Sequence, residues 1–424
     1  MPVTSMPSLL LCADRLFDAV SGCCRPGHAV LLAGERIAAV GPAVQLRQQA
    51  PPGTQVIEYG DACITPGLID AHTHASLAGD GRSYVQLFAE SDALMVLAGA
   101  MNLRRHLAAG ITTIRDHGAR NMVGFVLKEG LRRGYLVGPR LLASGRPITC
   151  TEGHFHMCNE VADGVEQMRQ SVRRLVHQGA DFIKIMASGG GTVGTLPGLA
   201  SYSLEELRAA VQEARHFGRL TAAHCRAAQA MARAAEAGVD LLEHAEFLRP
   251  DNELCFDPAL ADSLAERGVW LSPTLQAWTG YPSLAALYAR RAAGSLTSAE
   301  AQKLAALEQR AEPRLDLVRR LVDRGLKERI VPGTDSGVGN LEFGHLDYEL
   351  QLLVKTGFTP AEALVAATRV SAAAIGMADR LGTIEPGKVA DLAVFRGDPS
   401  TDLGALGHVL AVVQGGRVLS GLQG

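Results

Sequence analysis

The sequence predicts an α/β protein in which a (β/α)8 barrel, or TIM barrel, is joined to a small β-sandwich domain. Three observations support this fold class. Strand-like and helix-like segments alternate through the middle of the chain, short strand-like runs occupy both ends, and 424 residues suit one large barrel with an accessory domain. Hydrophobic residues make up 47% of the chain, which is ample material for such a core.

Eight strand-like segments can be placed in the middle of the chain. They are residues 67–74, 110–118, 140–145, 181–190, 219–225, 239–247, 268–274 and 329–337. Helix-like segments lie between them, and those at 162–180 and 204–218 reach a glycine near their ends, a common helix stop. Eight alternating strand–helix units indicate a closed barrel, to which we assign residues 63–377.

The two ends of the chain have a different pattern. Residues 29–42 contain two apolar runs around an Ala-Gly-Glu turn, which is typical of a hairpin. Residues 382–399 and 409–419 are strand-like runs interrupted by Pro, Gly and Asp. Because neither end can easily bury its faces alone, we expect residues 1–62 and 378–424 to pair into one composite β domain.

One connection in the barrel is unusually long. Residues 276–329 exceed what a single crossover helix needs, and they include Trp278, Tyr281 and Tyr288. A lid over the barrel mouth and a pair of packed outer helices are both compatible with this segment.

Residues with metal-binding chemistry occur at the ends of the predicted strands. They are His72, His74, Lys184, His224, His244 and Asp335. Alternation along a strand places the first two on the same side. Because the carboxyl ends of the strands hold the active site of such barrels, we expect all six side chains to converge. Neutral imidazoles and carboxylates suit Zn²⁺ and similar metals, whereas an unmodified lysine is a poor ligand because a dication repels its ammonium.

These motifs resemble the amidohydrolase superfamily of metal-dependent hydrolases. The resemblance rests on the segments DAHTH, FIKIMASGG, AAHC, LEHAEF and PGTDSG, which carry the six residues. It extends to both flanks of the barrel, at residues 64–74 and 382–395. The loop at residues 149–164 is similar to that of a subgroup that includes X-Pro dipeptidases, aryl-amide hydrolases, and hydrolases of phenylurea and thiocarbamate herbicides.

The resemblance implies a binuclear metal centre, most simply two Zn²⁺ ions. In such a centre CO2 or bicarbonate carboxylates Lys184, and the resulting carbamate bridges the two metals. By resemblance, His72, His74 and Asp335 hold the first metal, and His224 and His244 hold the second. A hydroxide shared by the metals would attack the substrate carbonyl, and Asp335 would pass its proton to the leaving group as a catalytic acid–base.

The expected function is therefore hydrolysis of a C–N bond of an amide, carbamate or urea. A metallo-dipeptidase acting on X-Pro or similar dipeptides is the alternative. A one-metal deaminase or cyclic-amide hydrolase is disfavoured, because the acid that often follows three positions after the strand-five histidine is Ala227 here. Schiff-base chemistry at Lys184 would not need four histidines, and a non-enzymatic scaffold would be expected to lose some of the six ligands.

Substrate contacts are expected from the loops over the strand ends. His154 is a candidate catalytic donor to the substrate carbonyl, although it could bond only its own backbone; His156 is a weaker candidate. Arg226 is the only nearby fixed cation that the sequence offers, and it could bind a substrate carboxylate or pair with an acid outside the barrel. The candidate walls are Phe155, Met157, Trp278 and Tyr281, and they favour a large apolar group beside the scissile bond. Asp116 is expected to support a ligand histidine.

Composition limits the partners. A formal net charge of −3 gives no indication of nucleic-acid or membrane-surface binding, and the eight cysteines, without a CxxC pair, indicate reduced thiols rather than a disulfide framework. The early apolar run SLLLCA is too short to span a bilayer and lacks a basic start, so a cytoplasmic location is expected. We also expect a small-molecule substrate and a homo-oligomer.

Overall fold

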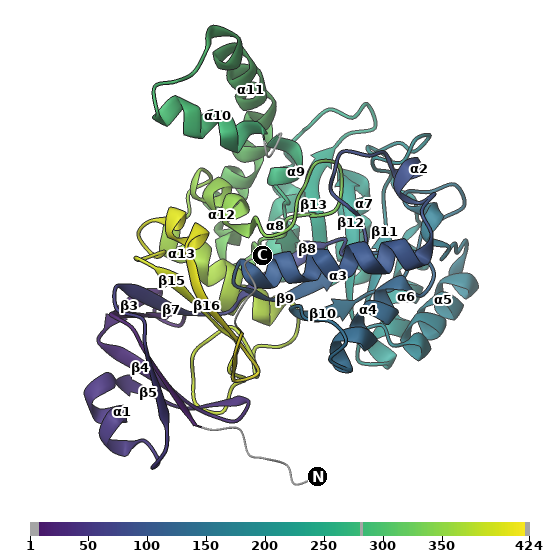
Figure 1. The fold of residues 1–424 in the computed structure, drawn as a ribbon. Helices are drawn as coiled ribbons and strands as arrows, with labels where there is room; N and C mark the ends of the chain where they lie inside the picture. The colour runs from purple at the N-terminus through teal and green to yellow at the C-terminus, as the bar shows by residue number, and fades with distance from the viewer. Residues whose placement is uncertain (1–7, 280–282, 420–424) are drawn as a thin grey trace.

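The structure is a computed structural model that describes residues 8–279 and 283–419. Its larger body is the predicted barrel, with parallel strands at its centre and helices around them (Figure 1). The strands fall into two runs, in the orders β10-β9-β8 and β11-β12-β13-β14. Their bounds are β8 Leu68–Thr73, β9 Ile111–Asp116, β10 Arg140–Ala143, β11 Phe182–Met186, β12 Leu220–Ala227, β13 Leu241–Leu248 and β14 Trp270–Ser272.

The two runs of strands meet through short bridges. Ile148, just beyond β10, pairs in parallel with Ile185 of β11. On the other side, Ile330 pairs with Leu271 of β14, and Ser336 pairs with Thr73 of β8. These bridges complete the circle of strands and confirm the barrel.

The prediction of a regular eighth strand at residues 329–337 is wrong in detail. Pro332 has no N–H to donate, and Asp335 has a φ of 57°, so a continuous ladder cannot form there. The segment is still fastened to β8, because the N–H of Ala71 bonds the carbonyl of Pro332 (3.1 Å) and the N–H of Asp335 bonds that of His72 (2.8 Å). The local departure from strand geometry sets the position of Asp335 at the barrel mouth.

Helices cover the outside of the barrel. Their starts follow capping rules: Ser203 and Glu206 form a reciprocal capping box at the start of α6, and Asp257 caps α8, which has proline at its first position. The principal helices are α3 Asp92–Ala108, α4 Val123–Arg132, α5 Val165–Gln178, α6 Leu204–His216, α7 Ala228–Ala237, α8 Pro258–Glu266 and α12 Leu346–Val354. None of the helices in the described residues is long and apolar enough to cross a membrane.

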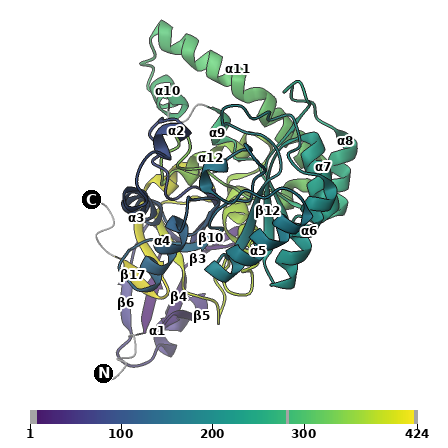
Figure 2. The ribbon, with the colours of Figure 1, turned by 90° about the vertical axis from the view of Figure 1, so that its right-hand side faces the viewer.

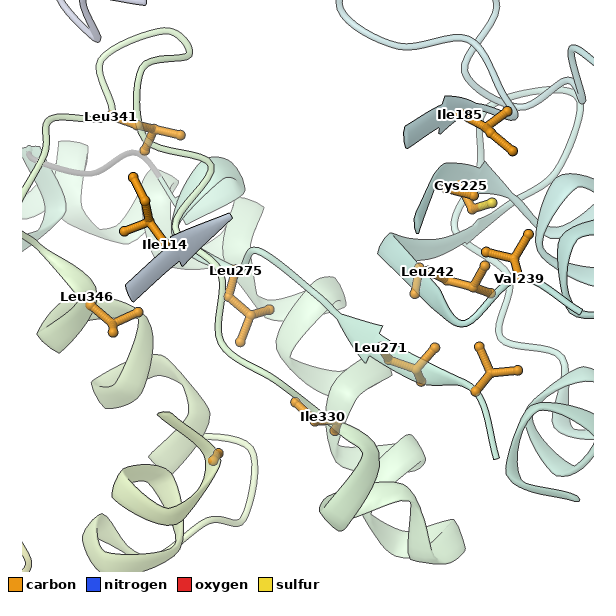
Figure 3. Packing of buried hydrophobic residues seen from close by; sticks show 14 of the residues in the cluster. Ile114, Ile185, Cys225, Val239, Leu242, Leu271, Leu275, Ile330, Leu341 and Leu346 are labelled. Carbon is orange, nitrogen blue, oxygen red and sulfur yellow. The ribbon is translucent and has the colours of Figure 1, made fainter. Parts of the chain in front are cut away.

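The barrel core is apolar between the strands and the helices. Figure 3 shows Ile185 and Cys225 from neighbouring strands close to Leu242, and Leu271 close to Ile330. These side chains are fully buried. Cys225, which lies beside His224, is therefore a small core residue.

Strands from both chain ends form the second domain. A six-stranded sheet has the order β17-β16-β15-β7-β2-β3, and a four-stranded sheet has the order β5-β4-β1-β6. Their apolar faces share one core, so the domain is a sandwich. Its strands are β1 Leu9–Cys12, β2 Arg15–Asp18, β3 Cys23–Pro26, β4 His28–Ala33, β5 Arg36–Pro42, β6 Gln55–Glu58, β7 Ala62–Pro66, β15 Leu392–Arg396, β16 Val409–Gln414 and β17 Arg417–Leu419. Strand β7 crosses the predicted domain boundary after residue 62 and then leads directly into β8.

The described part of the long connection after β14 contains three α-helices. They are α9 Gln276–Thr279, α10 Ser283–Ala292 and α11 Ser298–Leu321. Helices α10 and α11 project from the barrel as a hairpin, seen at the top of Figure 1 and from the side in Figure 2. The short α9 lies at the barrel mouth, where it packs against α11. The segment is thus an outer hairpin with one turn of helix over the site.

Candidate active site

A cavity of about 340 Å³ opens at the carboxyl ends of the barrel strands. The six strand-end residues predicted from the sequence all line it, as do His154, Arg226 and Trp278. Among the further lining residues, three with polar or charged side chains were not predicted: Tyr84, Arg310 and Asn340. The convergence that the strand positions indicated is therefore present in the structure.

Two histidines, one in β8 and one directly after it, face Asp335. The Nε2 atoms of His72 and His74 each lie 3.3 Å from Oδ1 of Asp335. His72, His244 and Asp335 each offer one ligand atom within 4.8 Å of the others. Across the cavity, the rings of His224 and His244 are 4.5 Å apart. The side chains thus lie at separations that one small cation or a pair of them could span.

Lys184 is the buried lysine of this cluster. Its side chain is 1% exposed, and among the described residues its Nζ has no hydrogen-bond partner. Burial lowers the pKa of Lys184 to about 8, although Glu243 and Asp335 act in the opposite direction. An appreciable fraction of the amine is therefore neutral near pH 8, and neutral amine is the form that CO2 can carboxylate.

Two imidazoles of the cluster, those of His224 and His244, are held neutral. Burial and neighbouring groups lower the pKa of His224 and His244 well below the ordinary value. Nδ1 of His244 lies 2.8 Å from Oγ1 of Thr274, which fixes the direction of its ring. The backbone is left-handed at both His244 (φ 67°) and Asp335 (φ 57°). Such strained residues occur preferentially at functional sites.

Two residues that contact the ring of His72, Glu243 and His117, were not predicted from the sequence. Oε2 of Glu243 lies 2.7 Å from Nδ1 of His72, and the ring of His117 stacks on that of His72 with centroids 4.2 Å apart. Simple alternation along the strand would place Glu243 and His244 on opposite faces. The left-handed backbone at His244 breaks that alternation, so sequence periodicity could not reveal the role of Glu243.

Asp70 fixes the two chain segments that carry the first ligands. Its Oδ1 accepts bonds from the N–H groups of His72 and Thr334, each at 3.1 Å, and its Oδ2 accepts one from the Thr334 hydroxyl at 2.6 Å. Asp116 was expected to support a ligand histidine. Its Oδ1 instead accepts the N–H of Ala75 at 2.8 Å, so it holds the backbone that follows His74.

His154 points into the cavity and His156 does not line it. Nδ1 of His154 lies 2.9 Å from the Thr192 hydroxyl, and its ring lies 4.5 Å from that of His224. Burial lowers the pKa of His154 to about 3, so its imidazole is neutral. Nδ1 of His156 lies 3.0 Å from the carbonyl of Gly153 within its own loop. Met157 lies beside His156, lining a separate cavity that shares Tyr84 with the first.

Trp278 forms one wall and is held by arginines. The guanidinium carbons of Arg226 and Arg314 lie 4.5 and 4.7 Å from its ring centroid. Both arginines donate to the buried carboxylate of Glu246. Arg310 donates to the carbonyl of Trp278 at 3.2 Å and also lines the cavity.

The expectation that Arg226 is the only nearby cation is therefore wrong. Arg310 lies in the middle of α11, where helical register and tertiary packing, rather than any motif, bring it to the site. Of the other predicted aromatic walls, Phe155 lines the cavity, whereas Tyr281 lies outside the described residues.

The residues present fit a metal centre. The cluster combines four imidazoles, one carboxylate and a buried amine that has no hydrogen-bond partner among the described residues. Such an amine is costly to bury unless something binds it. Imidazole and carboxylate are common ligands of Zn²⁺ and similar divalent ions. Glu243 orients His72 through the nitrogen that faces away from Asp335, as carboxylates commonly orient metal-binding histidines.

Comparisons with known proteins found a family model, relatives and solved structures that match most of the chain. A model of the Amidohydrolase family matches residues 63–419. Ochratoxinase of Aspergillus niger is 27% identical over 427 residues, which cover 93% of this chain and 83% of that protein. Imidazolonepropionase of Anaeromyxobacter sp. (strain K) is 28% identical over 433 residues, covering 93% and 90%. A crystal structure of a Xaa-Pro dipeptidase with bound methionine aligns with a TM-score of 0.81 at 26% identity, covering 98% of this chain and 100% of that one.

Proposed function

Because the chain belongs to the amidohydrolase family, and is therefore a hydrolase of C–N bonds, we propose that it is a two-metal enzyme cleaving an amide, carbamate or urea. The observation that carries this proposal is Lys184. Its buried amine has no hydrogen-bond partner among the described residues, and it lines the same cavity as the four histidines and Asp335. A site with a single metal ion would not need this lysine as a ligand.

The proposed ligands divide between two divalent ions, most simply Zn²⁺. His72, His74 and Asp335 would hold one, His224 and His244 the other, and Lys184, carboxylated by CO2 or bicarbonate, would bridge them. When bound, the ions would polarise the substrate carbonyl and supply a shared hydroxide as nucleophile near neutral pH. Two dications against a carbamate, a carboxylate and a hydroxide nearly balance in charge.

Asp335 and His154 are the proposed catalytic residues. Burial opposes ionisation of Asp335, but His72, His74 and Lys184 outweigh it and hold the pKa of Asp335 below its ordinary value. Its carboxylate is thus free to accept a proton and pass it to the leaving nitrogen, which cannot depart as an anion. When the Thr192 hydroxyl donates to Nδ1 of His154, Nε2 carries the ring proton and can donate to the developing oxyanion.

The test of the metal proposal is a difference measurement. We expect wild-type protein purified without added metal to contain about two more divalent ions per chain than the His72→Ala/His244→Ala double variant, measured by elemental analysis. The double variant removes a ligand from each proposed ion. A difference below one ion, unchanged by added Zn²⁺ and bicarbonate, would contradict a two-metal centre.

A substrate carboxylate is favoured by the arginines at one end of the cavity. Around Trp278, two guanidinium groups, those of Arg226 and Arg314, share the single carboxylate of Glu246. A third, that of Arg310, donates to the Trp278 carbonyl. The surplus positive charge would suit an amide whose leaving amine is an amino acid, as in the X-Pro dipeptidase alternative. A panel of N-acyl amino acids, X-Pro dipeptides, aryl amides and phenylureas on metal-loaded enzyme discriminates the classes. Carboxylate-bearing substrates should lose the most when Arg310→Ala is assayed.

Trp278→Ala tests the apolar wall. We expect kcat/KM to fall about tenfold for substrates with a large apolar group and little for small ones, because one aromatic contact contributes about 1–1.5 kcal/mol. The melting temperature should change little, since Trp278 is only half-buried. The control is Trp270→Ala. Trp270 lies at the start of β14, at the end of the strand away from the cavity, and its ring packs under Arg329. That variant should lose stability without changing substrate preference. An equal loss on all substrates in Trp278→Ala would mean that Trp278 only packs the hairpin.

A further inference from the structure

A second group of metal-binding side chains lies in the terminal β domain, away from the barrel mouth. Cys24 of β3 and Cys63 of β7 have their sulfur atoms 3.7 Å apart. Oδ1 of Asp398, in the turn after β15, lies 3.4 Å from Sγ of Cys24. The three ligand atoms all lie within 4.8 Å of one another. Ser400 completes the group, with its Oγ 3.3 Å from the same sulfur.

These separations match a tetrahedral zinc site. Two sulfur atoms about 2.3 Å from a tetrahedral Zn²⁺ lie about 3.8 Å apart, and a sulfur and a carboxylate oxygen about 3.6 Å apart. The observed distances are 3.7 and 3.4 Å. The fourth position faces the Ser400 hydroxyl or solvent, because Cys24 is half-buried whereas Cys63 is fully buried.

The charges around the group also suit a dication. Two thiolates and Asp398 would carry three negative charges, and Arg15 lies 4.0 Å from the other oxygen of Asp398. One Zn²⁺ would neutralise two of these charges, and Arg15, which also donates to Asp61 at 2.7 Å, lies close enough to offset part of the third. The hydrogen bond from Cys63 lowers the pKa of Cys24 and raises that of Cys63, so the two thiols share a proton that a metal could displace.

A disulfide fits the geometry less well than a metal. Strand β2 lies between β3 and β7 in the sheet. Two strand spacings of about 4.8 Å exceed the roughly 7 Å between Cα atoms that a disulfide can span. A metal bridges sulfur atoms without drawing them to bonding distance.

We propose that Cys24, Cys63 and Asp398 form a structural zinc site that fastens the N-terminal hairpin to the strand leading into the barrel and to the C-terminal turn. These three segments are remote in sequence, so one ion would tie both chain ends to the barrel. The site is independent of the hydrolytic centre, in which no thiolate ligand is proposed.

The test uses the spectrum of bound cobalt. Full-length protein, reduced and freed of metal, is titrated with Co²⁺, and the near-ultraviolet thiolate-to-cobalt charge-transfer absorption is followed. We expect this absorption to saturate at one ion per chain. It should be absent from Cys24→Ser and Cys63→Ser, weakened in Asp398→Asn, and unchanged in Cys23→Ser, the adjacent exposed cysteine. Zinc content should fall by one ion in the same two cysteine variants, with hydrolytic activity retained.

Two results would overturn the proposal. One is the absence of the charge-transfer absorption from wild type while cobalt fills the hydrolytic centre. The other is a Cys24–Cys63 disulfide, found by mass spectrometry in protein purified without reductant, together with no zinc lost in the cysteine variants. Asp398→Asn, which keeps the shape of the turn, decides the case if a cysteine variant fails to fold.

Discussion

Lys184→Ala is expected to lower kcat by about 10²–10³-fold while the protein stays folded. In the proposed centre the lysine supplies the anion between two metals, and loss of one such electrostatic element commonly costs two to three orders of magnitude. The fold should tolerate the change, because the amine has no partner among the described residues and its removal relieves a desolvated polar group. Steady-state kinetics, metal content and the melting temperature measure these effects together.

Chemical rescue makes the prediction specific to the bridging role. Bicarbonate or a short carboxylic acid should restore part of the rate to Lys184→Ala, because either can place oxygen atoms where the carbamate stood. Lys303→Ala, which removes an exposed lysine from α11, is the matched control and should keep full activity and show no response to added acid. Near-full activity of Lys184→Ala without any additive would exclude the bridging role.

The strand-end ligands could be predicted because two simple regularities place them. Parallel strands of a barrel expose their carboxyl ends at one mouth, and alternate residues of a strand share a side. His72, His74, Lys184 and His224 obey both rules, and the structure brings them together. The family model and the aligned crystal structure agree with the same fold.

The residues that sequence reasoning missed lie where these regularities fail. Glu243 reaches His72 because the backbone turns left-handed at its neighbour. Asp335 was predicted as a ligand, but the irregular backbone that holds it was not, because Pro332 and Gly333 interrupt the expected eighth strand. Arg310 and Tyr84 come from helices outside the barrel strands, and their approach to the cavity depends on how those helices pack. Spacing along a chain carries no information about such packing, so only the three-dimensional structure could find them.

Asp335→Asn is expected to lower kcat for an alkyl amide by about 10²–10⁴-fold, the usual contribution of a general acid–base. The substitution suits the site, because asparagine tolerates the left-handed backbone found there and keeps an oxygen near His72 and His74. KM and the melting temperature should therefore change little. Asp323→Asn, which changes an exposed aspartate earlier in the chain, serves as the control.

A comparison of substrates with different leaving groups distinguishes proton transfer by Asp335 from simple metal binding by Asp335. If Asp335 delivers a proton to the departing nitrogen, an ester or anilide with an acidic leaving group needs that proton less and should lose much less rate in Asp335→Asn than an alkyl amide. If Asp335 only holds a metal, all substrates should lose rate equally, and metal content should fall in parallel. A uniform loss with reduced metal would therefore remove Asp335 from the proton-transfer step while leaving it among the proposed ligands.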